Sequence, residues 1–468
     1  MSSSAAPPPS SPDGADRPSE PAGDERRPLW GAETSKAVEN FAISGEPIPR
    51  RVVHWLGRIK AAAALVNADL GLLDDDLAAR IAAAADDVAA GRHDGEFPVD
   101  VFQTGSGTSS NMNANEVISA LTDGDAHPND HVNLGQSSND VFPSAVHLAA
   151  LEAAHDDLLP ATATLAASLR GRADAFAHVV KAARTHLMDA VPVTLGDEFG
   201  GYAQQVRSAG EQIAATLPMV GQIPLGGTAT GSGLNTHPDF AAGVRARLAA
   251  GSSDAVGADI AAPPDRFAAQ GARDGLVALS GSLTVLAVAL TKICNDLRWM
   301  ASGPRAGLGE ITLPALQKGS SIMPGKVNPV IPEAVVQVAA QVIGNHGAVT
   351  AGAMQGNFEL NVTIPLLARN VISSIELLAS ASEVLAISCV DGIEADEERC
   401  EELAELTLAT ATALNPAIGY DAATEIVHEA HASGRPLRDV ARDHGVDAEA
   451  LDDALDLRRI AAGNRDDG

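Results

Sequence analysis

Long runs of apolar and small residues, interrupted by few charges, dominate the middle of the chain. Residues 275–291 contain no charged side chain, and residues 334–358 contain none either, although amide side chains interrupt them. A helix that is apolar all round must be covered by other helices in a bundle or an oligomer. Three further stretches have helical patterns and extend the prediction to five long helices, a bundle. These stretches are residues 142–176, 194–217 and 361–388.

The flanks of this central region have a different pattern. Residues 52–72 and 76–91 predict two amphipathic helices, and loops rich in Gly, Ser and Asn follow them up to residue 139. After residue 388 acidic residues return, and two or three short helices are expected before residue 460. The expected fold class is therefore mainly all-α, with a long central helical bundle. Neither uncharged segment is a persuasive membrane span, because one is short and the other is interrupted by polar side chains.

Composition restricts the class of partner. The 468 residues include 61 Asp and Glu against 32 Lys and Arg, which gives a formal net charge of −29. Such a surface repels nucleic acid and anionic membranes, so neither is an expected partner. Many acidic residues, few lysines and many alanines also suit a cytoplasm of high salt, where repulsion is screened. Halophilic adaptation is therefore a hypothesis about environment.

The cysteines and histidines argue against a disulfide framework and against a bound metal. Cys294, Cys389 and Cys400 are odd in number and form no CxxC pair, as expected of a protein from a reducing cytoplasm. An iron–sulfur cluster needs about three or four clustered thiolates, and no HExxH pattern is present. We expect no metal and no cofactor. Residues 1–27 are rich in Ser, Pro, Ala and Asp without an apolar stretch, which predicts a disordered tail rather than a signal peptide.

The densest group of reactive side chains lies in residues 319–329, Gly-Ser-Ser-Ile-Met-Pro-Gly-Lys-Val-Asn-Pro. Ser320, Ser321, Lys326 and Asn328 stand there between glycines and prolines, which stop a helix from running through. Lysine occurs at only six positions in the chain, so its use in this loop is selective. A surface turn with a solvated lysine is the alternative, but the pattern favours a lid that carries catalytic groups.

Two further segments combine small hydroxyl and amide residues. Residues 105–113 read Gly-Ser-Gly-Thr-Ser-Ser-Asn-Met-Asn, and residues 136–140 read Gln-Ser-Ser-Asn-Asp directly before a predicted helix. Backbone N–H groups and side chains of this kind converge readily on a carboxylate. The first segment could be a solvated loop, and the second could serve only as a helix cap. Capping and anion binding at a helix N-terminus do not exclude each other.

His186 lies in the segment Arg-Thr-His-Leu-Met-Asp-Ala, residues 184–190. A single histidine beside apolar residues is more often structural than catalytic. A histidine base that acts through water needs a carboxylate to orient its imidazole and raise its basicity. Glu333 lies seven residues beyond Lys326.

Together these segments resemble the signatures of the fumarase/aspartase superfamily, from about residue 30 to about residue 460. They favour the class II, metal-free fumarase branch. The resemblance implies a homotetramer in which three subunits contribute residues to each active site. It also implies three domains after the tail: residues 28–140, the central bundle 141–392 and a small helical domain 393–468.

The resemblance also implies a reaction and residue roles. The reaction is the reversible hydration of fumarate to (S)-malate in the tricarboxylic acid cycle, through a carbanion with aci-carboxylate character. Ser320 takes the C–H proton, Lys326 stabilises the carbanion, and His186 with Glu333 acts on water from the other face. The residues implied in dicarboxylate binding are Ser106, Gly107, Thr108, Ser137, Ser138, Asn139, Thr185, Ser321, Lys326, Val327 and Asn328. An accessory dicarboxylate site is implied at His127, Pro128, Asn129 and Asp130.

Two alternatives remain open at this point. Aspartate ammonia-lyases typically have glutamine at position 186 and asparagine at position 127, where this chain has histidine; residues 130–132 and 330–333, in contrast, look more like aspartase. A catalytically inert scaffold of the same fold is the other alternative, and the intact Ser320, Lys326 and His186 argue against it.

Overall fold

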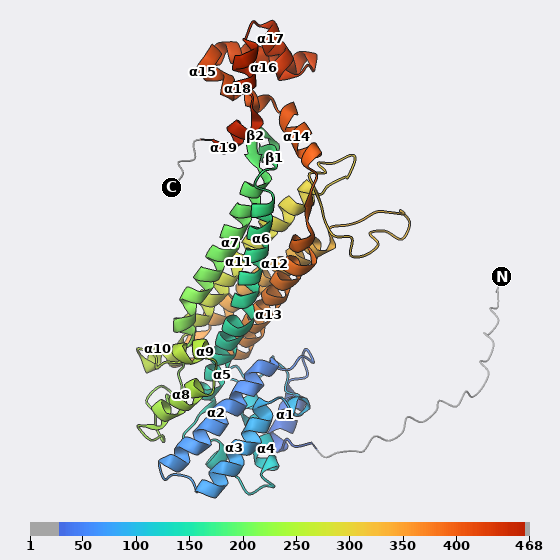
Figure 1. The fold of residues 1–468 in the computed structure, drawn as a ribbon. Helices are drawn as coiled ribbons and strands as arrows, with labels where there is room; N and C mark the ends of the chain where they lie inside the picture. Colours follow the sequence, from blue (N-terminus) through green and yellow to red (C-terminus); the bar gives the residue numbers. More distant parts are fainter. Residues whose placement is uncertain (1–27, 464–468) are drawn as a thin grey trace, which may run out of the picture.

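The computed structural model describes residues 28–463, so the predicted disordered tail, residues 1–27, lies outside the described residues. Long helices run side by side through most of the molecule (Figure 1). The mainly all-α class predicted from the sequence is therefore confirmed.

Five long helical elements form the bundle. The first is nearly continuous: a short π-helical stretch, η3, joins α5 to α6. The bundle closes as a ring, because α6 packs on α7, α7 on α11, α11 on α12, α12 on α13 and α13 on α6. The bounds are α5 Ser138–Glu152, η3 Ala153–Leu158, α6 Leu159–Ala175, α7 Leu195–Val220, α11 Asp274–Met300, α12 Val330–Ala353 and α13 Ile364–Ser388.

The predicted segment 334–358 differs from the observed helix at both ends. α12 begins at Val330 and stops at Ala353. The chain then turns through a small hairpin of β4 (Gly356–Asn357) and β5 (Leu360–Asn361) before α13 begins. Asn361 holds this hairpin against α12, since its side-chain amide donates to the carbonyl oxygens of Gly352 and Ala353 at 3.1 and 3.2 Å.

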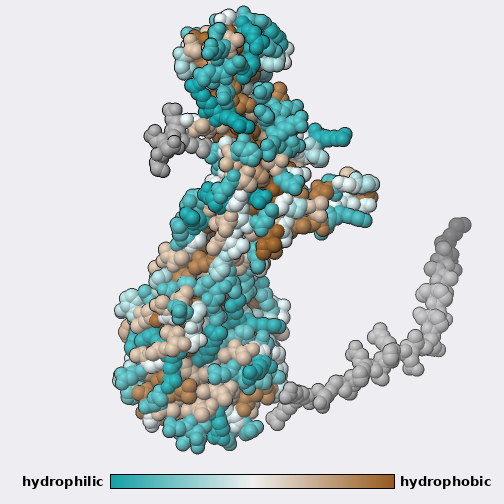
Figure 2. All heavy atoms as spheres, viewed as in Figure 1, coloured by the Kyte–Doolittle hydropathy of each residue, from teal (hydrophilic) through white to brown (hydrophobic). Residues whose placement is uncertain are grey.

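The bundle helices bury one side and leave another open, so the expectation of cover on all sides is not met within one chain. Val285 and Val288 on α11 and Ile343 on α12 are exposed. α11 and the stretch Ile364–Gly392 are long and apolar enough to cross a membrane, and about half of each is buried inside the protein. Buried bundle helices have the same composition, so this is weak evidence for a membrane span. Figure 2 shows apolar patches interrupting the polar surface of this region.

A separate layer of helices surrounds the N-terminal end of α5 (Figure 1). The two predicted amphipathic helices are present as α2 and α3, which pack on each other. The bounds here are α1 Ala32–Asn40, α2 Arg50–Asp69, α3 Asp75–Ala89, η1 Asp94–Glu96, α4 Thr108–Leu121 and η2 Pro128–Val132. Between α7 and α11 lie α8 Phe240–Ala250, α9 Asp254–Asp259 and α10 Arg266–Gly271.

A β-hairpin stands at the opposite end of the bundle, and the helical prediction did not include it. β1 (Val180–Thr185) pairs antiparallel with β2 (Met188–Thr194), between α6 and α7. Nearby, β3 (Ile311–Thr312) pairs with β6 (Glu394–Ala395), which follows the short turn η4 (Val390–Gly392).

The C-terminal helices form a second, smaller core. Leu414, Ile426, Val440 and Leu451 are buried together there, separate from the core of the bundle. Between residues 415 and 463 the structure has five short helices, where two or three were expected. The bounds are α14 Glu397–Leu406, η5 Leu408–Leu414, α15 Asn415–Ile418, α16 Tyr420–Ser433, α17 Leu437–Asp443, α18 Ala448–Ala454 and α19 Leu457–Ala462.

Candidate active site

The glycine-rich segment before α4 is held close to two other parts of the chain. Gly107 has φ +76°, and a Cβ there would lie 2.1 Å from the ring of Phe142 on α5. A Cβ on Gly105 would lie 1.6 Å from the carbonyl oxygen of Val362, and the Ile364 N–H donates to the carbonyl oxygen of Gly105 at 3.0 Å. Only glycine fits at these two positions, so the loop is pressed between α5 and the start of α13.

The N-termini of α4 and α5 meet through side chains. The Nδ2 atom of Asn111 on α4 donates to Ser138 Oγ at 3.0 Å. Ser137 and Asp140 form a capping box, and Asn139 Nδ2 donates to the carbonyl oxygen of Ala229 at 2.9 Å. Ser106 and Thr108 belong to the other predicted binding segment, residues 105–113. Their hydroxyl groups form a hydrogen bond of 2.8 Å. Both predicted carboxylate-binding segments therefore lie at neighbouring helix N-termini, a favourable environment for an anion.

Asp140 has a role that its capping pattern alone did not reveal. It is buried; one carboxylate oxygen accepts the Ser137 N–H at 2.9 Å, and the other accepts the N–H groups of Gly226 and Thr228 at 2.9 and 3.0 Å. Burial raises the pKa of Asp140 to about 6, although these amides favour its ionised form. The residue thus ties the N-terminus of α5 to the segment after α7.

The four residues of the predicted accessory site form one turn beside α4. The Nδ1 atom of His127 accepts the Asp130 N–H at 3.1 Å and lies 3.2 Å from a carboxylate oxygen of Asp130. Pro128 and Asn129 occupy the first positions of η2, which packs against α4. The His127 and Asp130 side chains are exposed.

His186 occupies the tip of the β1–β2 hairpin in an unusual conformation. His186 and Leu187 both have positive φ, +57° and +61°, which residues other than glycine rarely adopt. The Thr185–Met188 pair closes the turn beneath them. Among the described residues, the exposed His186 side chain has neither a hydrogen bond nor an ion pair. Backbone strain of this kind is concentrated at functional sites.

A buried ion-pair network below the hairpin was not apparent from the sequence. Glu310 is fully buried, and its carboxylate lies 2.9 Å from Arg184 Nη1 and 3.4 Å from Lys181 Nζ. Lys181 also pairs with Glu198 on α7 at 2.9 Å. The network joins β1 to α7 and to Glu310, the residue directly before β3. A cavity of about 650 Å³ adjoins it, lined in part by Arg184, Leu187, Tyr202 and Trp299.

The predicted lid projects from the side of the bundle between α11 and α12 (Figure 1). Ser320 Oγ accepts the backbone N–H groups of Ile322 and Met323, at 3.2 and 3.1 Å. The base of the loop is closed by Asn328 Nδ2, which donates to the Gly319 carbonyl oxygen at 2.8 Å, and by a backbone bond from Gly319 to Lys326. Two amide donors on one hydroxyl oxygen would favour its anionic form.

One chain does not assemble all the predicted groups. The cluster at α4 and α5 and the hairpin that carries Thr185 and His186 lie at opposite ends of the bundle, and the lid projects from its side (Figure 1). Within residues 28–463 of one chain no hydrogen bond or ion pair joins His186 to Glu333, so the contact that the resemblance implies stays a prediction. Glu333 lies instead in the first turn of α12.

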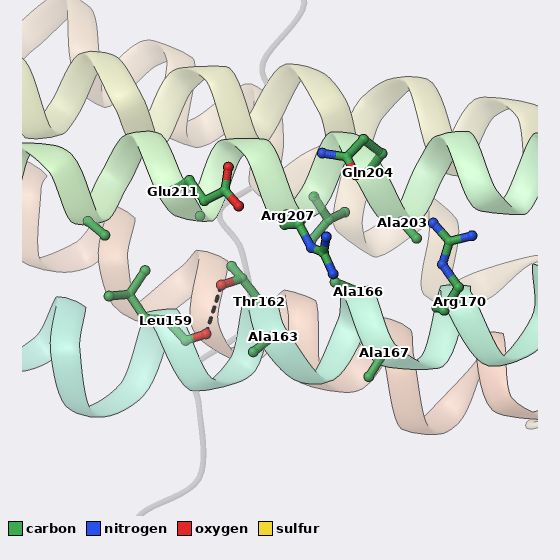
Figure 3. Close-up of a pocket in the computed structure, with 13 residues that line it drawn as sticks. Leu159, Thr162, Ala163, Ala166, Ala167, Arg170, Ala203, Gln204, Arg207 and Glu211 are labelled. Carbon is green, nitrogen blue, oxygen red and sulfur yellow. Dashed lines mark hydrogen bonds between the residues drawn. The ribbon is translucent and has the colours of Figure 1, made fainter. Parts of the chain in front are cut away.

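The groove between α6 and α7 contains none of the predicted site residues. It has a volume of about 560 Å³ and is lined by alanines with Thr162, Arg170, Arg207 and Glu211 at its edges (Figure 3). In the described part of the chain no three His, Cys, Asp or Glu side chains are grouped to hold a metal ion, and the three cysteines are free and buried.

Comparison with known proteins gives consistent matches along the chain. A family model described as Lyase matches residues 20–344, and one described as Fumarase C C-terminus matches residues 411–462. The class II fumarate hydratase of Corynebacterium glutamicum is 53% identical over 435 residues, covering 92% of this chain and 91% of its own. That of Mycobacterium tuberculosis is 51% identical over 441 residues, covering 92% of each.

Solved structures agree with these matches. A class II fumarase from Schistosoma mansoni superposes with a TM-score of 0.91 at 36% identity, covering 94% of this chain and 97% of its own. A fumarate lyase:delta crystallin from Brucella melitensis superposes with a TM-score of 0.88 at 44% identity, covering 93% and 96%.

Proposed function

Because the chain belongs to the class II fumarate hydratases of the lyase family, we propose that it interconverts fumarate and (S)-malate, a step of the tricarboxylic acid cycle. The observation that carries this proposal is the geometry of Ser320, whose hydroxyl oxygen already accepts two backbone amides in an exposed, hinged loop. The same loop resembles the superfamily signature, so geometry and resemblance select the same side chain.

The chemistry explains why the loop needs these groups. Dehydration of malate removes a weakly acidic C–H proton beside a carboxylate, which then carries nearly two negative charges. Donors and cations fixed around that carboxylate stabilise the transition state most. We assign this task to Lys326 and Asn328. Ser320 is the base, and the amides of Ile322 and Met323 stabilise its alkoxide.

His186 acts on the opposite face of the substrate. Hydroxide is a poor leaving group, so it departs with a proton, and in hydration the same group activates water. The strained hairpin tip presents the imidazole without a hydrogen-bond or ion-pair partner among residues 28–463 of its own chain. We assign Glu333 of another subunit as the carboxylate that orients it.

The remaining predicted residues are proposed to hold the dicarboxylate. Ser106, Gly107, Thr108, Ser137, Ser138 and Asn139 contribute from the N-termini of α4 and α5, Thr185 from the hairpin, and Ser321 and Val327 from the lid. His127, Pro128, Asn129 and Asp130 form the proposed accessory dicarboxylate site.

A homotetramer with active sites shared by three subunits accounts for the separation of these groups. Its support is the apolar surface left open by one chain: Leu187 and Met188 at the hairpin are 64% and 66% exposed, and Ile322 on the lid is 83% exposed. Exposed apolar surface at functional segments marks an interaction site. We also propose the division into domains at residues 28–140, 141–392 and 393–468, which the separate C-terminal core supports.

We propose further that the protein works in a reducing cytoplasm of high salt, without metal, cofactor, nucleic acid or membrane as a partner. The free cysteines and the net charge of −29 support this environment.

The decisive experiment follows fumarate by its absorbance, with malate, aspartate and argininosuccinate offered side by side. We expect fumarate to form from malate. Ammonia release from aspartate that outpaces malate dehydration would establish an aspartate ammonia-lyase, the alternative suggested by residues 130–132. A protein that leaves all three substrates unchanged would be an inert scaffold.

A further inference from the structure

Lys60 on α2 is fully buried, which is exceptional for this residue type. Its neighbours along the helix, Ile59 and Ala61 to Ala64, belong to the hydrophobic core. Moving an ammonium group out of water is costly unless an opposite charge accompanies it. A buried lysine therefore requires an explanation.

No carboxylate accompanies Lys60. Within the described chain no Asp or Glu oxygen lies within 4 Å of its Nζ atom, which donates only to the amide oxygens of Asn133 and Gln136, at 3.3 and 3.4 Å. The charge of Asp140 favours the protonated form of Lys60, although burial has the larger effect on it. The oxygens of Asp140 are already satisfied by three backbone amides.

The other buried lysine makes the contrast clear. Lys181 is 1% exposed, and two carboxylates, those of Glu198 and Glu310, lie 2.9 and 3.4 Å from its Nζ atom. Lys181 is thus paired with carboxylates, whereas Lys60 has none within ion-pair distance among the described residues. Exceptions to the rule that a buried charge is paired are concentrated at functional sites.

Lys60 lies directly behind the proposed substrate-binding segment. Asn133 Oδ1, which accepts from Lys60, also accepts from Asn111 Nδ2 at 3.2 Å. Asn111 in turn donates to Ser138 Oγ at 3.0 Å. Two side chains therefore separate the buried ammonium group from the N-terminus of α5.

We propose that Lys60 supplies the buried positive charge that attracts the dicarboxylate dianion to the N-terminus of α5, so that the bound substrate is its missing counter-charge. The inference rests on the proposed function. Lys60 does not contact the substrate; it is a positioning residue that acts through its field and through Asn133 and Asn111. In a chain of net charge −29, a local cation is needed to hold a dianion against general repulsion.

The test compares Lys60→Met with Asn67→Leu, a matched control. Asn67 lies seven residues further along α2, is also buried, and donates to the carbonyl oxygen of Leu134 in the same segment at 3.0 Å. Its substitution removes one hydrogen bond to that segment without changing the charge. Lys60→Gln is a second variant that loses the charge but keeps an amide donor.

At pH 6.5, where the Lys60 ammonium group is mostly protonated, we expect Lys60→Met and Lys60→Gln to raise KM for fumarate, and the inhibition constant of succinate, by about tenfold or more. Their kcat should stay within about threefold of the parent value, because the reacting groups are untouched. Asn67→Leu should change KM by less than about twofold. Equal shifts for Lys60→Met and Asn67→Leu would show a structural role, and unchanged values in both Lys60 variants would overturn the proposal.

Binding of succinate measured by calorimetry separates this inference from the proposed function. If the parent protein failed to hydrate fumarate, the proposed function would fall, and succinate affinity would still report on Lys60. If Lys60→Gln binds succinate more weakly and Asn67→Leu binds it as the parent protein does, the result supports the proposed attraction of the dicarboxylate by the Lys60 charge. Equal affinity in the parent protein and Lys60→Gln rejects it.

Discussion

Arg184 Nη1 lies 2.9 Å from the carboxylate of Glu310, a fully buried side chain far away in sequence. Arg184 stands two residues before His186, so this ion pair fastens the base of the hairpin whose tip carries the proposed acid–base group. Both partners of a buried pair must be present, because removal of one leaves an uncompensated charge.

Glu310→Gln should therefore lower the free energy of unfolding by about 3 kcal/mol, since Arg184 and Lys181 lose a shared counter-ion. Turnover should fall as well, because the hairpin loses its anchor. Chemical denaturation with activity measured in parallel checks both effects. The matched control is Glu397→Gln, whose exposed pair with His178 should contribute less than about 1 kcal/mol. A Glu310→Gln protein as stable as this control would contradict the assigned role.

Ser320→Ala should reduce kcat by about 10² to 10⁴-fold, the usual contribution of a general base. The assembly should stay intact, since the side chain is only half-buried and belongs to a surface loop. Steady-state kinetics and size-exclusion chromatography measure the two properties. Ser321→Ala, one residue away, should lose much less turnover. Near-normal activity of Ser320→Ala would transfer the role of base to Ser321 or to a water molecule.

His186→Gln creates the side chain typical of aspartases and should lower turnover of malate by at least about a hundredfold. Inhibition by succinate should weaken far less, because Lys326, Asn328 and the hydroxyl groups remain. His178→Gln at the same end of the molecule serves as the control and should stay active. We expect no useful release of ammonia from aspartate by the variant. A large loss of succinate affinity would instead indicate that His186 mainly binds substrate.

Low salt should destabilise the protein if its acidic surface is adapted to high ionic strength. At about 0.01 M salt the Debye length is about 30 Å, so charges across the whole surface repel one another. Differential scanning calorimetry in low and in molar salt should show a Tm that rises with salt. An uncharged osmolyte at matched osmolality controls for preferential exclusion. Equal Tm values in low and molar salt would refute the salt hypothesis.

Lys60 should make stability rise with pH above neutrality. Burial lowers its pKa to about 7, whereas an unfolded lysine has a pKa of about 10.4. Between these values the unfolded chain binds more protons than the folded one, so the free energy of unfolding increases with pH. Below pH 7 Lys60 is protonated in both the folded and the unfolded chain, so the buried charge lowers the free energy of unfolding by its full amount. The free energy of unfolding of Lys60→Met should therefore exceed that of the parent protein most at pH 6.5. This difference should be smaller at pH 9. A constant difference in Tm between the two proteins would contradict this.

The long helices could be predicted from the sequence because their apolar patterns are local. The ends of these helices were less predictable. Residues 354–358 are as uncharged as the rest of α12 beyond Glu333, yet the Asn361 amide donates to the last carbonyl groups of that helix and the chain turns into a hairpin. Strand pairing between residues 180 and 194 depends on the turn at His186, whose positive φ no residue preference would predict.

Only part of the candidate site could be predicted from the sequence. The types and spacing of hydroxyl, amide and glycine residues indicate binding segments at residues 105–113, 136–140 and 319–329. Lys60 and Glu310 do not, because a buried charge is recognisable only once packing shows what surrounds it. The separation of His186 from Glu333 within one chain could not be predicted from the sequence either, because it depends on where the bundle places its two ends.

The separation of the hairpin and the lid within one chain allows two defective alleles to complement each other if subunits share their sites. A cell that carries two alleles, one defective at the hairpin and the other at the lid, would assemble mixed forms of the proposed tetramer. Some active sites in these tetramers would draw an intact hairpin from one gene product and an intact lid from the other. Two inactive proteins would then restore part of each other's activity, whereas two defects in the same segment would not.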